Sequence, residues 1–253
     1  MDLKKIGRRQ SFLFGGALLV DARRVYVNSN VQQKCRRKFV QFVQLTISRN
    51  DAIINVSNEE RLNNMKKSEH FTRELELIVN EDLRMAVKSY LDEYVPDYFF
   101  EIGASSTGKY HPKFSQGQGG LVRHVKAVVM FAEELMRMST YAYMRDDYKD
   151  FAFAACIIHD CAKYGMTEFD KTEYKNHASN GAQMFADWCE QIGYDVNQYL
   201  LDAVRTHMGQ WSEREDRPFT NIDRLVHMAD YMASRSFIDI PQIMEEWNAV
   251  EES

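Results

Sequence analysis

The second half of this chain contains six residues that can bind a metal ion, in the order His124, His159, Asp160, His177, His207 and Asp230. Four of the chain's seven histidines belong to this series. They interrupt segments that otherwise show the apolar spacing of packed helices. A single histidine in such a place is usually a packed residue whose ring nitrogens are satisfied by neighbours. The six together favour a metal centre on which several helices converge.

Apolar spacing predicts a mainly α-helical fold. Gly103 to Gly120 is rich in glycine and serine and includes Pro112, so this segment is expected to be a loop. A long helix should precede the loop and end before Pro96. The expected helices are Ser68–Tyr94, Leu121–Met138, Tyr148–Cys161, His177–Ile192, Asn197–Met208 and Asn221–Ser236.

The N-terminal part of the chain differs from the rest in charge. The whole chain has a net charge of -5, which argues against a broad basic surface for nucleic acid. Within residues 1–50, however, Asp2 and Asp21 are the only acids among many bases. We therefore expect a basic appendage over residues 1–60 and a helical domain over residues 61–253.

Two elements are expected within this appendage. Ser11–Val20 and Arg23–Asn28 suit a short β-hairpin, and Val31–Ser48 suits a basic amphipathic helix. The basic run of this helix is either a solvated face or a contact for a polyanion. The candidate polyanion contacts are Lys34, Arg36, Arg37 and Lys38.

The cysteine pattern and the absence of long apolar runs favour a cytoplasmic protein. The four cysteines have no CxxC spacing and no dense framework, so we expect reduced thiols. The bases before Ser11 loosely imitate a secretory signal, but Gly15, Gly16 and Asp21 fit a hairpin better. No stretch approaches the roughly 20 apolar residues that a membrane span needs.

The pair His159-Asp160 follows the apolar run Phe151–Ile158 and precedes Gly165, a helix stop signal. An adjacent histidine and aspartate can present an imidazole nitrogen and a carboxylate oxygen to one pocket from a helix end. The pair is therefore expected where a buried helix meets a cleft.

The ordered set resembles the HD-domain metal-dependent phosphohydrolase superfamily, in particular its two-metal members. The resemblance extends over about Gly119 to Ser236 and implies a helical bundle. It also implies that two divalent ions are bound, without distinguishing manganese, iron, magnesium, cobalt and nickel. It makes Asp160 a bridging ligand, and it divides the others into a first set, His124, His159 and Asp230, and a second set, His177 and His207.

Other residues are candidates for substrate contact. The segment Ser105 to Pro112 is similar to a substrate-side loop of some bacterial and phage members. Lys163 would hold a phosphate as a point charge, or it is an ordinary lysine that interacts with carbonyls at a helix end. Further candidates for substrate contact are Lys109, His111 and Arg123, with a merely solvated loop as the alternative.

Two histidines outside the series, His227 and His70, are not expected to bind metal directly. His227 lies one helical turn before Asp230, so it either supports a ligand or is an ordinary core or surface residue. His70 is expected to be exposed to solvent.

The resulting hypothesis is hydrolysis of a phosphoester in a nucleotide, cyclic nucleotide or nucleic acid by metal-activated water, with Asp160 and Lys163 as catalytic residues. One alternative keeps the same ligands but forms a mixed-valence di-iron oxygenase. A second is a catalytically silent nucleotide-sensing or interaction module. The intact set of six ligands argues against the silent module.

Overall fold

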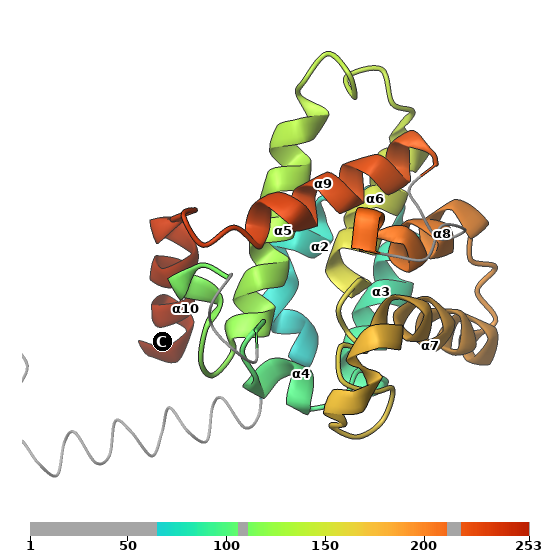
Figure 1. Ribbon diagram of the computed structural model, residues 1–253. Helices are drawn as coiled ribbons and strands as arrows, with labels where there is room; N and C mark the ends of the chain where they lie inside the picture. Colours follow the sequence, from blue (N-terminus) through green and yellow to red (C-terminus); the bar gives the residue numbers. More distant parts are fainter. Residues whose placement is uncertain (1–64, 106–110, 212–218, 253) are drawn as a thin grey trace, which may run out of the picture. The chain divides into compact units, whose positions relative to one another are not determined.

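The computed structural model describes residues 65–105, 111–211 and 219–252. The predicted N-terminal appendage, with its hairpin and basic helix, lies outside these ranges, as does Lys109. Within them the protein is helical and contains no β-strand (Figure 1), which confirms the predicted fold class for this part. The α-helices are α2 Thr72–Glu76, α3 Glu81–Glu93, α4 Tyr98–Glu101, α5 Gly120–Met136, α6 Asp146–Ile158, α7 His177–Ile192, α8 Gln198–Thr206, α9 Asn221–Ala233 and α10 Pro241–Glu252. Single 3-10 turns are η1 Lys67–Phe71, η2 Lys113–Ser115, η3 Lys171–Asn176 and η4 Gly209–Trp211.

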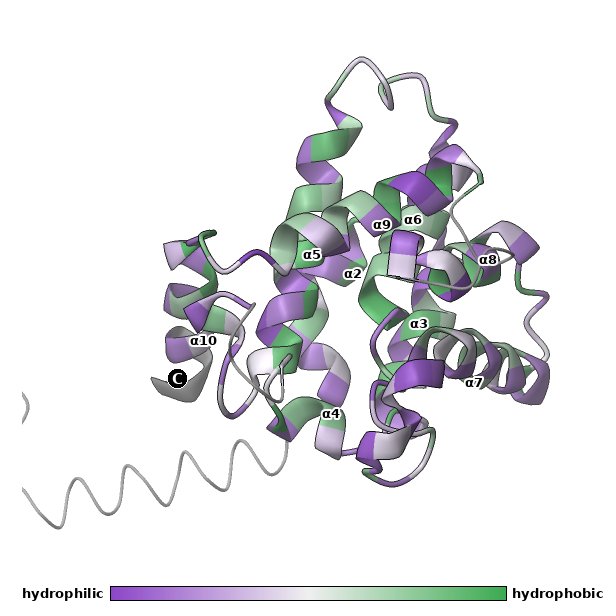
Figure 2. Cartoon of the chain, viewed as in Figure 1, coloured by the Kyte–Doolittle hydropathy of each residue, from purple (hydrophilic) through white to green (hydrophobic). Residues whose placement is uncertain are grey.

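At the centre of the bundle, α6 and α9 pack against each other and each packs against both α5 and α8, while α7 packs on α8 and α3 packs on α6 (Figure 1). Residues 152–158 of α6 are all buried, and Figure 2 shows this hydrophobic helix passing through the middle of the bundle. Each fully buried large aliphatic side chain in such a core stabilises the fold by about 1.5–3 kcal/mol. The core therefore holds the ends of these four helices in fixed relative positions.

The expected single helix Ser68–Tyr94 is wrong, because the chain breaks between α2 and α3. The side chain of Asn80 caps α3 by accepting a hydrogen bond from the Leu83 backbone. The backbone N–H groups of Val79 and Asn80 donate to the carboxylate of Asp150 on α6, at 2.9 and 2.8 Å. A carboxylate distant in the sequence thus stabilises the break.

The other predicted helices are confirmed, with shorter C-terminal ends for four of them. Helix α7 has the predicted bounds because Gly193 takes a left-handed conformation, with φ of 71°. Helix α9 begins at a capping box formed by Thr220 and Asp223. Helix α6 was expected to reach Cys161 but ends at Ile158, so the His-Asp pair lies beyond the helix.

Helix α10 was not predicted, although Pro241 at its first position is a favourable start. It packs against α5 (Figure 1), and the Trp247 ring stacks on His70 at a centroid separation of 5.6 Å. The expectation that His70 is exposed is therefore wrong. Burial between helices lowers the pKa of His70 to about 4.

The three cysteines within the described ranges, Cys156, Cys161 and Cys189, are buried free thiols, as expected. In the same ranges, no helix has the length and apolar character needed to span a membrane.

Candidate metal centre

The six predicted ligands lie within two turns of a helix end or directly after one. His124 is in the second turn of α5, and Asp230 is in the last turn of α9. The remaining four flank helix ends: His159 and Asp160 follow α6, His177 begins α7 and His207 follows α8. Because these helices pack together, the six side chains meet at one place, where all except the half-buried Asp230 are buried.

One group of donor atoms surrounds one oxygen of Asp160. Its Oδ2 atom lies 3.7 Å from Nε2 of His124 and 3.5 Å from Nε2 of His159. Oδ1 of Asp230 lies 3.1 and 3.8 Å from the same two nitrogens. Ligand atoms about 2.1 Å from one ion are separated from each other by about 3–3.5 Å in tetrahedral or octahedral sites. These four residues are therefore close to the spacing of a single coordination sphere.

The other oxygen of Asp160 faces a second group. Its Oδ1 atom lies 3.4 Å from Nε2 of His177 and 3.9 Å from Nε2 of His207. These two nitrogens are 3.1 Å apart. The two groups are contiguous, since donor atoms of His159, His207 and Asp230 also lie within 4.8 Å of one another. The two oxygens of one carboxylate thus face two sets of imidazoles.

Backbone carbonyls orient three of the histidines. Nδ1 of His159, His177 and His207 lies 2.7, 2.5 and 2.7 Å from the carbonyl oxygen three residues earlier. A hydrogen bond of this kind puts the ring proton on Nδ1 and leaves the Nε2 lone pair for a metal. Nε2 of His159 is buried and has no hydrogen-bond partner within the described residues. An ion would satisfy this atom, so the residues fit a bound metal.

The electrostatics favour the protonation states that bind metals. Burial, together with the neighbouring histidines, lowers the pKa of His207 to about 3. Burial opposes ionisation of Asp160, but Lys163 and His159 hold the pKa of this carboxyl well below its ordinary range. His159 is the exception, since Asp160 and Asp230 outweigh burial and raise its pKa. Neutral imidazoles and ionised carboxylates are the forms that coordinate a cation.

Comparison with protein families agrees with this geometry. Residues 121–235 match the HD domain family, and this range includes all six residues. This part of the chain is an HD domain. At the level of the family, the match assigns a metal-dependent phosphohydrolase type of activity on phosphorylated substrates. Comparisons with curated proteins and with solved structures gave no match.

Lys163 lies beside the candidate metal centre. Its Nζ is 2.6 Å from Oδ2 of Asp160, and the side chain is buried. The expected helical turn between His159 and Lys163 is not formed, because the chain after α6 continues in turns. The alternative of a lysine bound to helix-end carbonyls is not what the structure shows, because the ammonium pairs with a carboxylate. Burial would lower the pKa of Lys163, but Asp160 raises it.

The structure separates two other candidates for substrate contact, His111 and Arg123. His111 lines a cleft beside the centre, and its ring centroid is 5.5 Å from that of His124. Arg123 does not line this cleft. Its guanidinium donates to the carbonyls of Phe114 and Gln116, at 2.5 and 2.9 Å, and lies over the Trp247 ring. Arg123 thus joins the loop to α5 and α10.

The cleft has a volume of about 910 Å³ and includes Asp160, Lys163, His177, His207 and Asp230 in its wall. Sequence reasoning missed several residues that line it, among them Tyr174, Lys175, Trp211 and Tyr231. The positions of these four in the sequence were a usable signal, because each lies within four residues of a predicted ligand.

His227 is half-buried, and its Nδ1 lies 2.7 Å from the backbone oxygen of His207. This contact joins His227 to the backbone of a predicted ligand.

Proposed function

We propose that this HD domain binds two divalent metal ions and hydrolyses a phosphoester in a nucleotide, cyclic nucleotide or nucleic acid. One observation carries the proposal: the two oxygens of Asp160, a residue that lines a cleft, face two separate pairs of imidazole Nε2 atoms. A carboxylate in this position can bridge two ions.

In this proposal the first ion is held by His124, His159 and Asp230, and the second by His177 and His207, with Asp160 shared. A pair of ions at such a site supplies an activated water near neutral pH and neutralises charge on the phosphoryl oxygens. The Nδ1 hydrogen bonds of three histidines support this role, because they fix the rings before an ion binds.

Lys163 is proposed to position the phosphate. Its ammonium has three N–H groups, and the contact with Oδ2 of Asp160 accounts for one of them. The buried location keeps this charge close to the ligands, where water screens it little. His111, whose imidazole has a pKa of about 3 because of burial and of the nearby His124 and Lys163, offers a neutral hydrogen-bonding group on the same cleft.

The cleft suits an anionic ligand of nucleotide size. Its volume of about 910 Å³ lies within the roughly 300–1,000 Å³ that is common for small-molecule sites. The basic side chains in its wall are Lys163, Lys175, Arg205 and Arg235, against the two carboxylates Asp160 and Asp230. Bound cations would make the wall still more positive, which attracts phosphates.

The test is hydrolysis of phosphoesters by the purified full chain, with the products separated by chromatography. Metal-free protein would be loaded with manganese, magnesium, cobalt, nickel or iron. It would then be given nucleoside triphosphates, monophosphates, cyclic dinucleotides and single-stranded oligonucleotides. We expect turnover of at least one class that a chelator abolishes and added metal restores. Oxygen uptake measured in parallel, without hydrolysis of any substrate, would replace this proposal with an oxygenase.

A further inference from the structure

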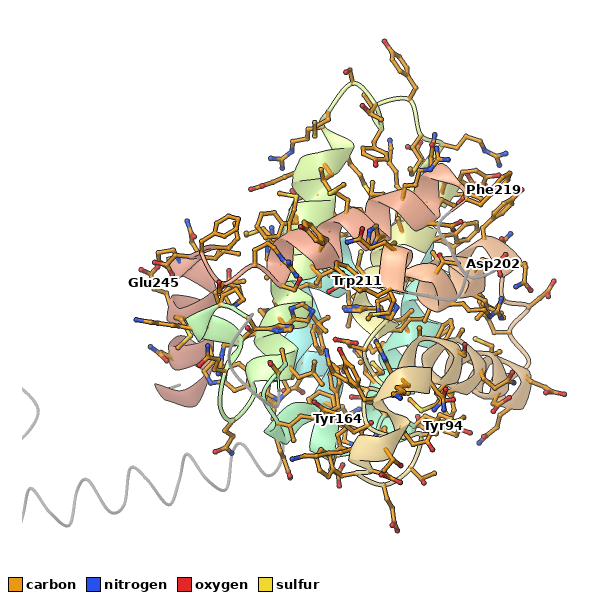
Figure 3. All side chains as sticks on the ribbon, viewed as in Figure 1. Tyr94, Tyr164, Asp202, Trp211, Phe219 and Glu245 are labelled. Atoms are coloured by element: carbon orange, nitrogen blue, oxygen red, sulfur yellow. The ribbon has the colours of Figure 1, made fainter. Side chains whose placement is uncertain are left out.

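Trp211 is an exposed aromatic residue in the wall of the cleft that contains the metal centre. Trp211, which is labelled in Figure 3, is 55% accessible to solvent and lines the same cleft as Lys163. Its ring stacks on that of Tyr231, with an interplanar angle of 16° and centroids 5.8 Å apart. Two parallel rings in a cationic cleft form a surface on which a third planar ring can stack.

Both aromatic residues are close in sequence to predicted metal ligands. Tyr231 follows Asp230, and Trp211 is four residues after His207. The intervening Gly209 has φ of 58°, and a Cβ atom there would lie only 2.1 Å from the His227 ring. This close approach, together with the hydrogen bond from the Trp211 backbone N–H to Met208, turns the chain so that Trp211 lies on α9. The aromatic surface is thus fixed relative to the centre.

The charges near this surface suit a phosphate-bearing ligand. The Arg235 guanidinium lies over the Tyr231 ring, 4.2 Å from its centroid, and also lines the cleft. Lys175 and Arg205 line the cleft as well. An aromatic platform combined with a positively charged groove is the arrangement that binds nucleotides through base stacking and phosphate contacts.

We propose that Trp211, supported by Tyr231, stacks the base of a nucleoside phosphoester whose phosphate lies at Lys163 and the metal centre. The position of the phosphate rests on the proposed function, whereas the stacking of the base does not. Stacking is tolerant of base identity because every base has a planar face. The platform therefore selects nucleoside phosphoesters over phosphoesters of non-aromatic alcohols without selecting one base.

The test compares two probes that resist hydrolysis, adenosine 5′-thiomonophosphate and inorganic thiophosphate, by titration calorimetry on the metal-loaded full chain. The parent should bind the nucleotide at least tenfold more tightly than thiophosphate. Trp211→Ala should weaken nucleotide binding about tenfold and leave thiophosphate binding unchanged. Trp211→Phe keeps an aromatic face and should retain most of the affinity. Tyr143→Ala, which removes an aromatic residue that is 95% exposed and does not line the cleft, should bind both probes like the parent.

Failure of this inference and failure of the proposed function have different signatures. If Trp211→Ala binds the nucleotide as tightly as the parent, or if both probes weaken equally in a folded variant, the stacking role is wrong. If the parent does not bind the nucleotide, the stacking role is also wrong. If base-dependent binding persists while no phosphoester is hydrolysed with any metal, the stacking role stands and the proposed hydrolysis does not.

Discussion

Replacing Asp160 by asparagine separates a metal centre from an ordinary buried cluster. The substitution keeps the shape of the side chain but removes the negative charge that four imidazoles and Lys163 surround. Without added metal, it leaves the buried Lys163 ammonium without its carboxylate partner. Losing one member of a buried ion pair costs about 3–5 kcal/mol of folding stability.

The decisive quantity is the stabilisation that metal adds. An ion present at about a thousand times its dissociation constant stabilises the folded state by about 4 kcal/mol. For a domain of roughly 150–250 residues, each kcal/mol raises Tm by about 2–4 °C. The parent Tm should therefore rise by about 8–16 °C for each ion that binds when metal is added after chelation. Asp160→Asn should lose nearly all of this rise, because Asp160 belongs to both ligand sets.

Asp150→Asn is the matched control, because it alters a different buried carboxylate, which lies within α6. Asp150 accepts two backbone hydrogen bonds at the break between α2 and α3 and does not belong to the metal centre. Weakening them should cost about 1–3 kcal/mol without metal but preserve the full metal-dependent rise. Differential scanning fluorimetry with and without metal provides the comparison. An Asp160→Asn variant with the parental metal-dependent rise would refute the proposed centre.

Three further predictions concern stoichiometry, acid stability and the N-terminal segment. Replacing both His177 and His207 with alanine should reduce the bound metal, as measured by elemental analysis, from about two ions per chain towards one. A single ion in the fully loaded parent would contradict the second site. The pKa of His70 is about 4 in the folded protein and about 6.5 when unfolded, so its contribution is present above pH 6.5 and is lost as pH falls towards 4. Urea unfolding should show that, between pH 6.5 and 4, the parent loses up to about 3 kcal/mol more unfolding free energy than His70→Gln. Equal losses in parent and variant would disprove the assignment. If the basic segment binds a polyanion, replacing Arg36, Arg37 and Lys38 with glutamine should weaken that binding and reduce its salt dependence. Turnover of a small phosphoester should not change. Equal polyanion binding by parent and variant at low salt would exclude this role.

Much of the helical framework is predictable from the sequence because each helix carries its own signals. The apolar spacing of α5 and α9 and the stop at Gly193 act within single elements, and these helices formed close to their predicted bounds. The break before α3 was not predictable in this way. It depends on Asp150, about seventy residues further along the chain, which satisfies the backbone of Val79 and Asn80.

The sequence by itself determined which residue types would meet, because histidines and aspartates on apolar helix faces stand out against a hydrophobic pattern. Only the tertiary structure decided how they meet. It turned the oxygens of Asp160 towards different histidine pairs, brought Lys163 to the same carboxylate and placed the Arg123 guanidinium over the Trp247 ring. It also laid Trp211 on Tyr231. These arrangements depend on contacts between distant segments, and periodicity within one helix carries no information about the neighbour that will cover it.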